Sequence, residues 1–168
     1  LDWDTSSSTA LTLGFRVENE SLGGSRVGPR VAFVWRPSDT SVLRCAYLTS
    51  TRSPQIFEQH INFAAHYPVS PYPVVYRILP NSDLKPEETS NFEVGYRQQL
   101  GTITLDLTVY HMTIKDLINQ VTVAVGPPVD TQFQNTGDAK NLGAELALTW
   151  QAARGWTVGG NAAYVDFQ

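Results

Sequence analysis

The chain has 168 residues, of which 42% are hydrophobic and 17% charged, and its formal net charge is −4 at pH 7. A chain of this length can bury a core, and its acidic balance argues against a nucleic-acid partner, which would select a basic patch. It contains no run of roughly 18 apolar residues that would predict a transmembrane helix. The single cysteine, Cys45, excludes an internal disulfide.

The predicted elements are strands, because apolar and polar residues alternate with a period of two along most of the chain. Leu1-Asp2-Trp3 resembles the end of a strand, and no initiator Met or signal peptide precedes it, so we expect a fragment of a longer protein. About seven strands follow, without a convincing amphipathic helix. They cover residues 9–18, 30–36, 43–47, 92–97, 102–109, 142–150 and 156–167.

The run from residue 102 to 109 shows the alternation most clearly. One of its faces should meet an apolar phase and the other a polar one. The tight turn Gln99-Leu100-Gly101 joins it to the preceding strand, and Gly101 can supply a positive φ there. The apolar face carries Ile103, Leu105, Leu107 and Val109, and the polar face carries Thr102, Thr104, Asp106 and Thr108.

The connections between these strands alternate in length. Short turns are expected at residues 4–8, 38–40, 99–101 and 152–155, and longer polar loops at 19–29, 52–87 and around 126–130. An antiparallel up-and-down sheet with tight turns at one end and long loops at the other is typical of outer-membrane barrels. Soluble barrels can share this pattern, so further evidence is needed.

The four tryptophans supply that evidence, because each lies within a few residues of a short turn. Amphipathic rings gathered at one level of a barrel are typical of a membrane interface. An alternative is that they are core residues that happen to lie near strand ends. The predicted membrane-interface residues are Trp3, Trp35, Trp150 and Trp156.

Several ordered motifs give the chain a family resemblance. They are PRVAFVWRP at 29–37, LRCAY at 43–47, TRSP at 51–54, DLKPE at 83–87, NFEVGYR at 91–97, YHMTIKDLI at 110–118 and NTGDAKNLGAE at 135–145. In this order they resemble the barrel of TonB-dependent outer-membrane receptors. The similarity extends over nearly the whole chain.

The resemblance implies an all-β, antiparallel up-and-down transmembrane barrel of about 22 strands with a plugged lumen. Residues 1–168 would form only part of this barrel, with the plug domain and signal peptide lying elsewhere. The implied function is energy-coupled uptake of a scarce nutrient through the bacterial outer membrane: a ferric siderophore, heme, cobalamin or a carbohydrate. Outer-membrane lipid and the TonB complex, reached through N-terminal regions, would be the partners.

The long loop over residues 52–87 is the expected ligand-binding region. Its rings and cations suit stacking on a planar ligand, coordinating iron or holding an anion. The candidates are His60, His66, Tyr67, Tyr72, Tyr76 and Arg77. The resemblance adds that TRSP at 51–54 and NSDL at 81–84 occupy the places of two boxes that bracket a histidine in heme receptors, although both depart from the heme version.

No catalytic constellation, resident cofactor or metal site is predicted. The carboxylates Glu87 and Glu88 have no partner at a defined spacing and are expected to be solvated. Two further alternatives are a complete eight-stranded membrane barrel and a small soluble binding module, either a β-sandwich or a lipocalin-like barrel. In the soluble alternative, Ile103, Leu105 and Leu107 would pack inside a closed core.

Overall fold

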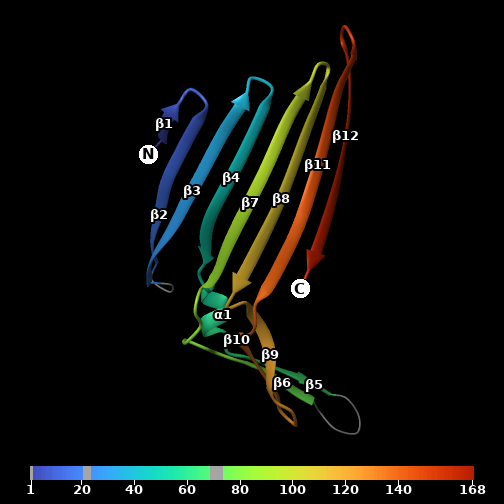
Figure 1. Ribbon diagram of the computed structural model, residues 1–168. Helices are drawn as coiled ribbons and strands as arrows, with labels where there is room; N and C mark the ends of the chain where they lie inside the picture. Colours follow the sequence, from blue (N-terminus) through green and yellow to red (C-terminus); the bar gives the residue numbers. More distant parts are fainter. Residues whose placement is uncertain (1, 21–23, 69–73) are drawn as a thin grey trace.

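In the computed structural model, which describes residues 2–20, 24–68 and 74–168, the chain forms two β-sheets (Figure 1). The larger one, here called the wall, has eight strands in the order β1-β2-β3-β4-β7-β8-β11-β12. All of its neighbours are antiparallel. The wall strands are β1 (Asp2–Ser6), β2 (Thr9–Glu20), β3 (Gly24–Ser38), β4 (Ser41–Arg52), β7 (Glu87–Leu100), β8 (Ile103–Lys115), β11 (Ala139–Ala153) and β12 (Trp156–Phe167).

The wall confirms the predicted up-and-down order. The short turns all lie at the upper end in Figure 1, and the other connections leave from the opposite end. The long loop expected at residues 19–29 was wrong, because β2 continues to Glu20 and β3 begins at Gly24. Gly101 and Gly155 occupy two of these turns with φ of 59° and 84°, values that favour glycine because it lacks a Cβ. The seven predicted strands are present, and β1 is the strand whose end the first residues suggested.

The second sheet, here called the external sheet, was not predicted. It has four strands in the order β5-β6-β10-β9 and hangs from the loop end of the wall (Figure 1). Its first hairpin belongs to the connection between β4 and β7, and its second to the connection between β8 and β11. The elements are α1 (Ile56–His60), β5 (Phe63–Tyr67), β6 (Val74–Leu79), β9 (Ile118–Ala124) and β10 (Val129–Asn135).

The register of the wall confirms the two predicted faces. Leu107 lies opposite Tyr96 of β7 and Leu146 of β11, so the apolar positions of neighbouring strands join into one band. The band has no second layer over it among the described residues: Leu107 is 40% exposed and Leu146 42%. The soluble alternative required these side chains to meet in a closed core, and they do not.

The opposite face is polar and carries an arginine that spans two strands. Arg44 of β4 donates to both oxygens of Asp106 on β8 at 2.8 and 3.3 Å, and to the Thr108 hydroxyl at 2.7 Å. Its side chain crosses Gly95 of β7, which lies between Arg44 and Thr108 in the register. A Cβ on Gly95 would overlap the guanidinium group, so this position needs the absence of a side chain.

Replacing Gly95 by alanine should therefore displace Arg44 and weaken its bonds to Asp106 and Thr108. We expect a loss of about 1 to 3 kcal/mol in unfolding free energy, the usual range for overpacking. Gly14→Ala is the matched control, because the space beside this wall glycine is open apart from Arg30 Cβ at 4.0 Å. Denaturant unfolding of the full-length protein in lipid vesicles would compare them, and equal stabilities would contradict the role assigned to Gly95.

Candidate functional site

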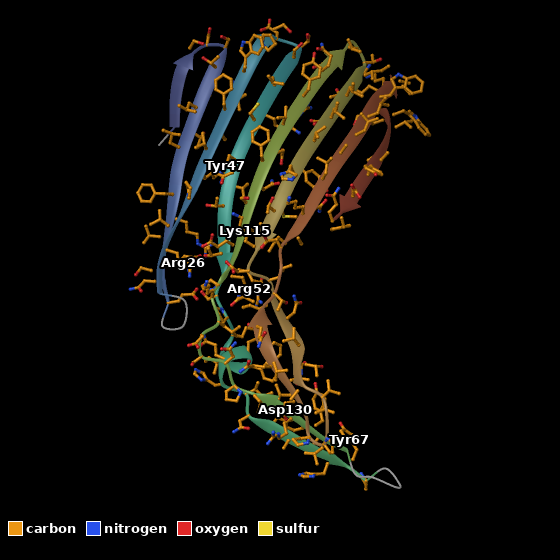
Figure 2. The ribbon with its side chains drawn as sticks, turned by 60° about the horizontal axis from the view of Figure 1, so that its bottom comes forward. Arg26, Tyr47, Arg52, Tyr67, Lys115 and Asp130 are labelled. Carbon is orange, nitrogen blue, oxygen red and sulfur yellow. The ribbon has the colours of Figure 1, made fainter. Side chains whose placement is uncertain are left out.

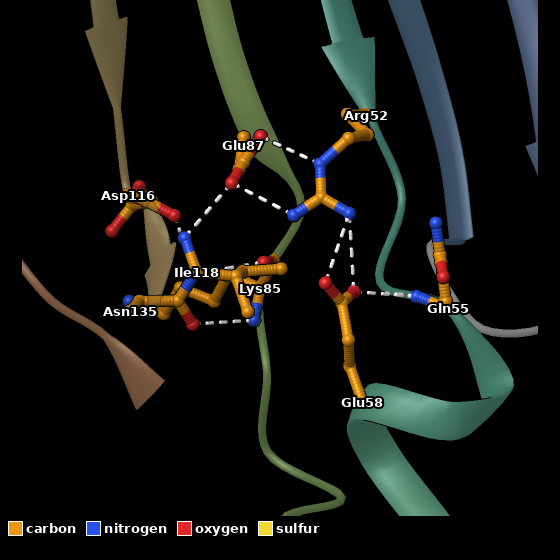
Figure 3. A network of polar contacts seen from close by, with 8 residues as sticks. All are labelled: Arg52, Gln55, Glu58, Lys85, Glu87, Asp116, Ile118 and Asn135. Atoms are coloured by element: carbon orange, nitrogen blue, oxygen red, sulfur yellow. Dashed lines mark hydrogen bonds and ion pairs between the residues drawn. The ribbon is translucent and has the colours of Figure 1, made fainter. Parts of the chain in front are cut away.

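One arginine joins the external sheet to the wall (Figure 3). At the end of β4, the Nε and Nη2 atoms of Arg52 donate to Glu87 of β7 at 2.7 and 2.8 Å. Its Nη1 atom donates to both carboxylate oxygens of Glu58 in α1 at 3.1 Å. Glu87 also accepts the backbone N–H of Ile118, the first residue of β9, at 2.9 Å. We call Arg52, Glu58, Glu87 and the Ile118 N–H the clamp, since it ties both long loops to the wall.

An asparagine makes a second tie beside the clamp. The side-chain oxygen of Asn135, at the end of β10, accepts the N–H of Lys85 at 2.8 Å. Its amide nitrogen donates to the carbonyls of Lys85 at 2.9 Å and Asp116 at 2.6 Å. Leu84 and Ile118 are the buried hydrophobic residues in the described part of the chain, and they flank these ties in sequence. The junction between the external sheet and the wall therefore combines ion pairs, hydrogen bonds of a side-chain amide and burial of apolar side chains.

The two loop boxes noted in the sequence take part in this architecture. The first contains Arg52 of the clamp, and the second begins with Asn81. The Asn81 N–H donates to the Gln59 carbonyl at 2.9 Å, and its side-chain amide donates to the Phe133 carbonyl at 2.8 Å. Asn81 thus links α1 to β10. One residue of each box, Arg52 or Asn81, therefore forms hydrogen bonds that hold the loop in place.

The electrostatics of the clamp correct the expectation that Glu87 and Glu88 are simply solvated. Hydrogen bonding from Arg52 lowers the pKa of Glu87 below its usual value, and burial opposes this shift. The same bond raises the pKa of Arg52. Glu88 lies at 3.1 Å from Arg26 Nη1. Both carboxylates therefore have cationic partners from other strands.

The lowered pKa of Glu87 predicts how the clamp depends on pH. Because the folded pKa lies below the usual glutamate value of about 4.3, the contribution to stability is complete above that value. It is lost as the pH falls through the folded pKa. Amide exchange of Ile118, corrected for the intrinsic effect of pH, should stay slow from neutral pH to about 5 and speed up below about 4. In Glu87→Gln this acid transition should disappear; its persistence would assign the transition to another group.

The external sheet separates the predicted ligand residues between its two faces. Residues directly opposite one another in the strand register share a face. His66 pairs with Val75 and Ala64 with Arg77, so His66 and Arg77 lie on one face. Tyr76 pairs with Ala65 and Tyr67 with Val74, which places the two tyrosine positions on the other face. The four candidates on β5 and β6 therefore do not share one face.

Two of these candidates already have structural partners. Arg77 donates to both oxygens of Asp130 at 2.7 Å, which lowers the pKa of Asp130. The Tyr76 hydroxyl accepts from the Gln120 amide at 2.7 Å and from the Thr131 hydroxyl at 3.1 Å. Arg77 and Tyr76 thus join β6 to β9 and β10, and their contact with a ligand stays a prediction.

The remaining candidates are exposed or lie outside the described residues. His60 ends α1, and His66 and Tyr67 lie on the edge strand β5, all three being exposed to solvent. Tyr67 appears near the far tip of the external sheet in Figure 2. Tyr72 falls in the range 69–73, outside the described residues. Among residues 2–20, 24–68 and 74–168, no group of three His, Cys, Asp or Glu side chains could hold a metal ion.

The tryptophans lie where the sequence predicted, close to the short turns. Trp35 and Trp150 are each 44% exposed and Trp156 is 72% exposed, while Trp3 lies opposite Leu11 in β1. The register from Trp35 leads over four strand steps to Leu146, four residues from Trp150, so the tryptophan level crosses the strands at a slant. Their place in a membrane interface stays a prediction.

A second aromatic level, nearer the loops, was missed in the sequence. Its members occupy apolar positions of four strands and are exposed by 41% or more of their surface. Tyr47 lies directly opposite Phe92, but across the whole wall, from β2 to β12, the level shifts toward the short turns, as the tryptophans do. Barrels that cross a membrane carry aromatic girdles at both interfaces. This outer aromatic level consists of Phe15, Tyr47, Phe92 and Tyr164.

The single helix in the described part of the chain, α1, is too short and too polar to cross a membrane.

Comparison with known proteins identifies the wall. A family profile described as TonB dependent receptor-like, beta-barrel, matches residues 1–168. The iron-regulated outer membrane virulence protein of Vibrio cholerae is 28% identical over 158 residues, which cover 88% of this chain and 23% of that protein. The probable TonB-dependent siderophore receptor PirA of Acinetobacter baumannii is 28% identical over 155 residues, covering 88% of this chain and 19% of that protein.

Solved structures show the same fold. The siderophore receptor PirA from Pseudomonas aeruginosa aligns with a TM-score of 0.83 at 18% identity, over 99% of this chain and 32% of that chain. A mutant of the ferric enterobactin receptor from the same species, in complex with enterobactin, gives a TM-score of 0.79 at 21% identity, over 95% of this chain and 25% of that chain. The chain spans less than a quarter of the length of the curated relatives it matches. These relatives are receptors, as predicted, and not enzymes. The chain belongs to the TonB-dependent receptor family of outer-membrane β-barrels.

Proposed function

We propose that this chain is the part of a ferric siderophore receptor that holds two of its external loops in one ligand-facing unit. The observation that carries the proposal is the external sheet, in which strands from two separate loops pair with each other and are clamped to the wall. A sheet built on such a junction presents side chains in a fixed arrangement, which reduces the entropy lost on binding. The relatives named as siderophore receptors support the proposed substrate class.

The exposed surface of the external sheet favours contact with rings over capture of an anion. Phe63 is 49% exposed and Tyr67 53% exposed on the edge strand β5, and His66 lies between them in the chain. Arg77, the cation of this sheet, is neutralised by Asp130. Aromatic side chains stack on flat ligands such as the aryl groups of a chelator. We therefore assign recognition to β5 and to the end of α1.

In the whole receptor, uptake would also require energy coupling. The TonB complex, which the family name implies, would act through parts of the receptor other than this barrel segment. The ligand reaches the external sheet first, since long loops of such barrels face the cell exterior. The tie through Arg52 then connects the ligand-facing unit to β4 and β7.

The test is uptake by cells in which the full-length receptor is the sole iron route. Radioactive iron would be supplied as ferric enterobactin, as other ferric siderophores of defined chemistry, or as hemin. We expect uptake from a siderophore, and a fall of tenfold or more when residues 62–79 are replaced by a short Gly-Ser linker. His60→Ala and His66→Ala together should leave siderophore uptake measurable. Uptake of hemin alone, abolished by the two histidine changes, would overturn the assignment in favour of heme.

A further inference from the structure

A cleft opens in the outward-facing side of the wall, just beyond the outer aromatic level. It has a volume of about 410 Å3 and lies where β3 turns away from β4, with β7 and β8 forming its other side. Figure 2 shows three residues around it, Arg26, Tyr47 and Lys115. The cleft is formed entirely by wall strands, so it is separate from the external sheet and from the ligand proposed above.

A proline explains why the cleft exists. The ladder between β3 and β4 ends at the pair Arg30 and Leu48, and the next residue of β3 toward the loops is Pro29. Proline has no N–H to donate, so it interrupts a ladder inside a sheet. The Thr49 hydroxyl instead donates to the Pro29 carbonyl at 3.3 Å. Beyond this point β3 continues to pair with β2, and β4 continues to pair with β7. The two strand pairs therefore separate.

The cleft is lined by hydroxyls and has a net positive charge. Its charged lining residues are Arg26, Lys115 and Glu88. Arg26 pairs with Glu88 at 3.1 Å, and Glu88 lies directly opposite Lys115 in the register. Lys115 is exposed and forms no ion pair with the described residues. The outward hydroxyl groups come from Ser25, Thr49, Thr51 and Ser90, and Tyr47 lies nearest the apolar band, whereas the bordering Ser50 and Thr89 alternate toward the polar face.

The position of the cleft narrows the choice of ligand. On β4, β7 and β8 the outward positions change from Tyr47 and Phe92 to Ser, Thr and charged residues within two steps toward the loops. In an outer-membrane barrel this is the level of the headgroups of the outer leaflet. A lysine at a membrane surface attracts anionic headgroups, and serine and threonine hydroxyls bond to phosphate and to sugar hydroxyls.

We propose that this cleft binds the phosphorylated sugar headgroup of an outer-leaflet glycolipid, with Lys115 beside Arg26 at the phosphate. The hydroxyl lining holds the sugar, and Tyr47 packs at the boundary where the acyl chains begin. Glu88 positions Arg26, and its negative charge weakens the attraction of the cleft for small anions in general. Binding of the glycolipid in this cleft does not depend on the ligand that the receptor transports.

The experiment uses the full-length receptor in detergent micelles and lipid A, an acylated glucosamine disaccharide with two phosphates, as the probe. Native mass spectrometry would measure the bound lipid across a titration. We expect Lys115→Gln to weaken binding about fivefold, the effect of about one surface cation on an anionic lipid. Lys140→Gln is the matched control, because Lys140 is an exposed lysine at the loop end of β11 that does not line the cleft. It should change binding by less than twofold.

A second variant tests the cleft by filling it. Ser90→Phe leaves every charge in place but fills the cleft from its β7 side, and it should lower lipid A binding at least as much as Lys115→Gln. Heat-dependent gel mobility would show that each variant is folded. Equal weakening by Lys115→Gln and Lys140→Gln would overturn the proposal in favour of diffuse surface attraction. Equal binding of phosphatidylglycerol, or complete displacement by millimolar inorganic phosphate, would also overturn it.

Discussion

Replacing Arg52 by methionine is expected to release the external sheet from the wall while leaving the barrel folded. The change removes four hydrogen bonds to carboxylates and leaves Glu58 and Glu87, with side chains 12% and 13% exposed, without their shared cation. Hydrogen bonds to charged groups contribute roughly 1.5 to 3 kcal/mol each at most, and Arg52 is partly exposed, so we expect local opening to become easier by about 2 to 3 kcal/mol. Amide exchange in β9 and β10 should then accelerate by about 30-fold to 150-fold.

The matched control is Arg16→Met, which removes an arginine from another pair at the loop end of the wall. Arg16 pairs with Glu18, but its side chain is 76% exposed, so its loss should change stability by less than about 1 kcal/mol. Both variants should keep the heat-dependent gel mobility of a folded barrel, because neither residue belongs to the apolar band. Unchanged protection of β9 and β10 in Arg52→Met would show that Asn135 and the buried Leu84 and Ile118 hold the external sheet without the clamp.

The wall could be predicted from the sequence because its signal is local. Alternation over eight residues or more assigns the faces of β2, β8 and β11 without any knowledge of their neighbours. The register then follows from the short turns, since a hairpin with two turn residues leaves its strands little choice of pairing. The family motifs point to the same strands, and the structure confirms both.

The external sheet could not be predicted because its pairing is not local. β6 and β10 are parallel strands from different loops, and Arg77 meets Asp130 across 53 positions of the sequence. β5, with the sequence FAAHY, shows no alternation that separates a strand from a loop. Two charged residues did carry a usable signal: Arg52 lies in the first loop box and Glu87 ends the DLKPE motif. An arginine and a glutamate at the two ends of one long loop are placed to meet when the loop closes.

The predicted ligand residues on β5 and β6 lie on two faces of the external sheet for a related reason. The candidates share residue types that suit a ligand and are spread over the whole loop. The alternation of side chains along each strand then places them on different faces. Neighbouring residues of a strand point to opposite faces, so His66 and Tyr67 cannot share a surface on β5. Tyr76 and Arg77 separate in the same way on β6. Only knowledge of the strands would have selected the exposed subset.

Replacing Leu107 by arginine is expected to have the largest effect on the wall. Leu107 lies in the middle of the apolar band, opposite Tyr96 and Leu146. An arginine on the lipid face at mid-bilayer costs about 2 to 4 kcal/mol, and about 0 to 1 kcal/mol near the interfaces. Denaturant unfolding of the full-length receptor in lipid vesicles should therefore show a loss of about 2 to 4 kcal/mol for Leu107→Arg and less than about 1 kcal/mol for Ile103→Arg, which lies beside the short turn.

The opposite face of the same strand provides the control. Thr104 lies opposite Gln99 and Thr149 on the polar face, so Thr104→Arg adds the same side chain to a hydrated surface. We expect a change within about 0.5 kcal/mol, the usual size for an exposed position. If instead Ile103→Arg cost as much as Leu107→Arg, the dependence on depth that defines a bilayer would be missing. The loss would then have to come from packing against protein, and the apolar band would be covered by another part of the receptor.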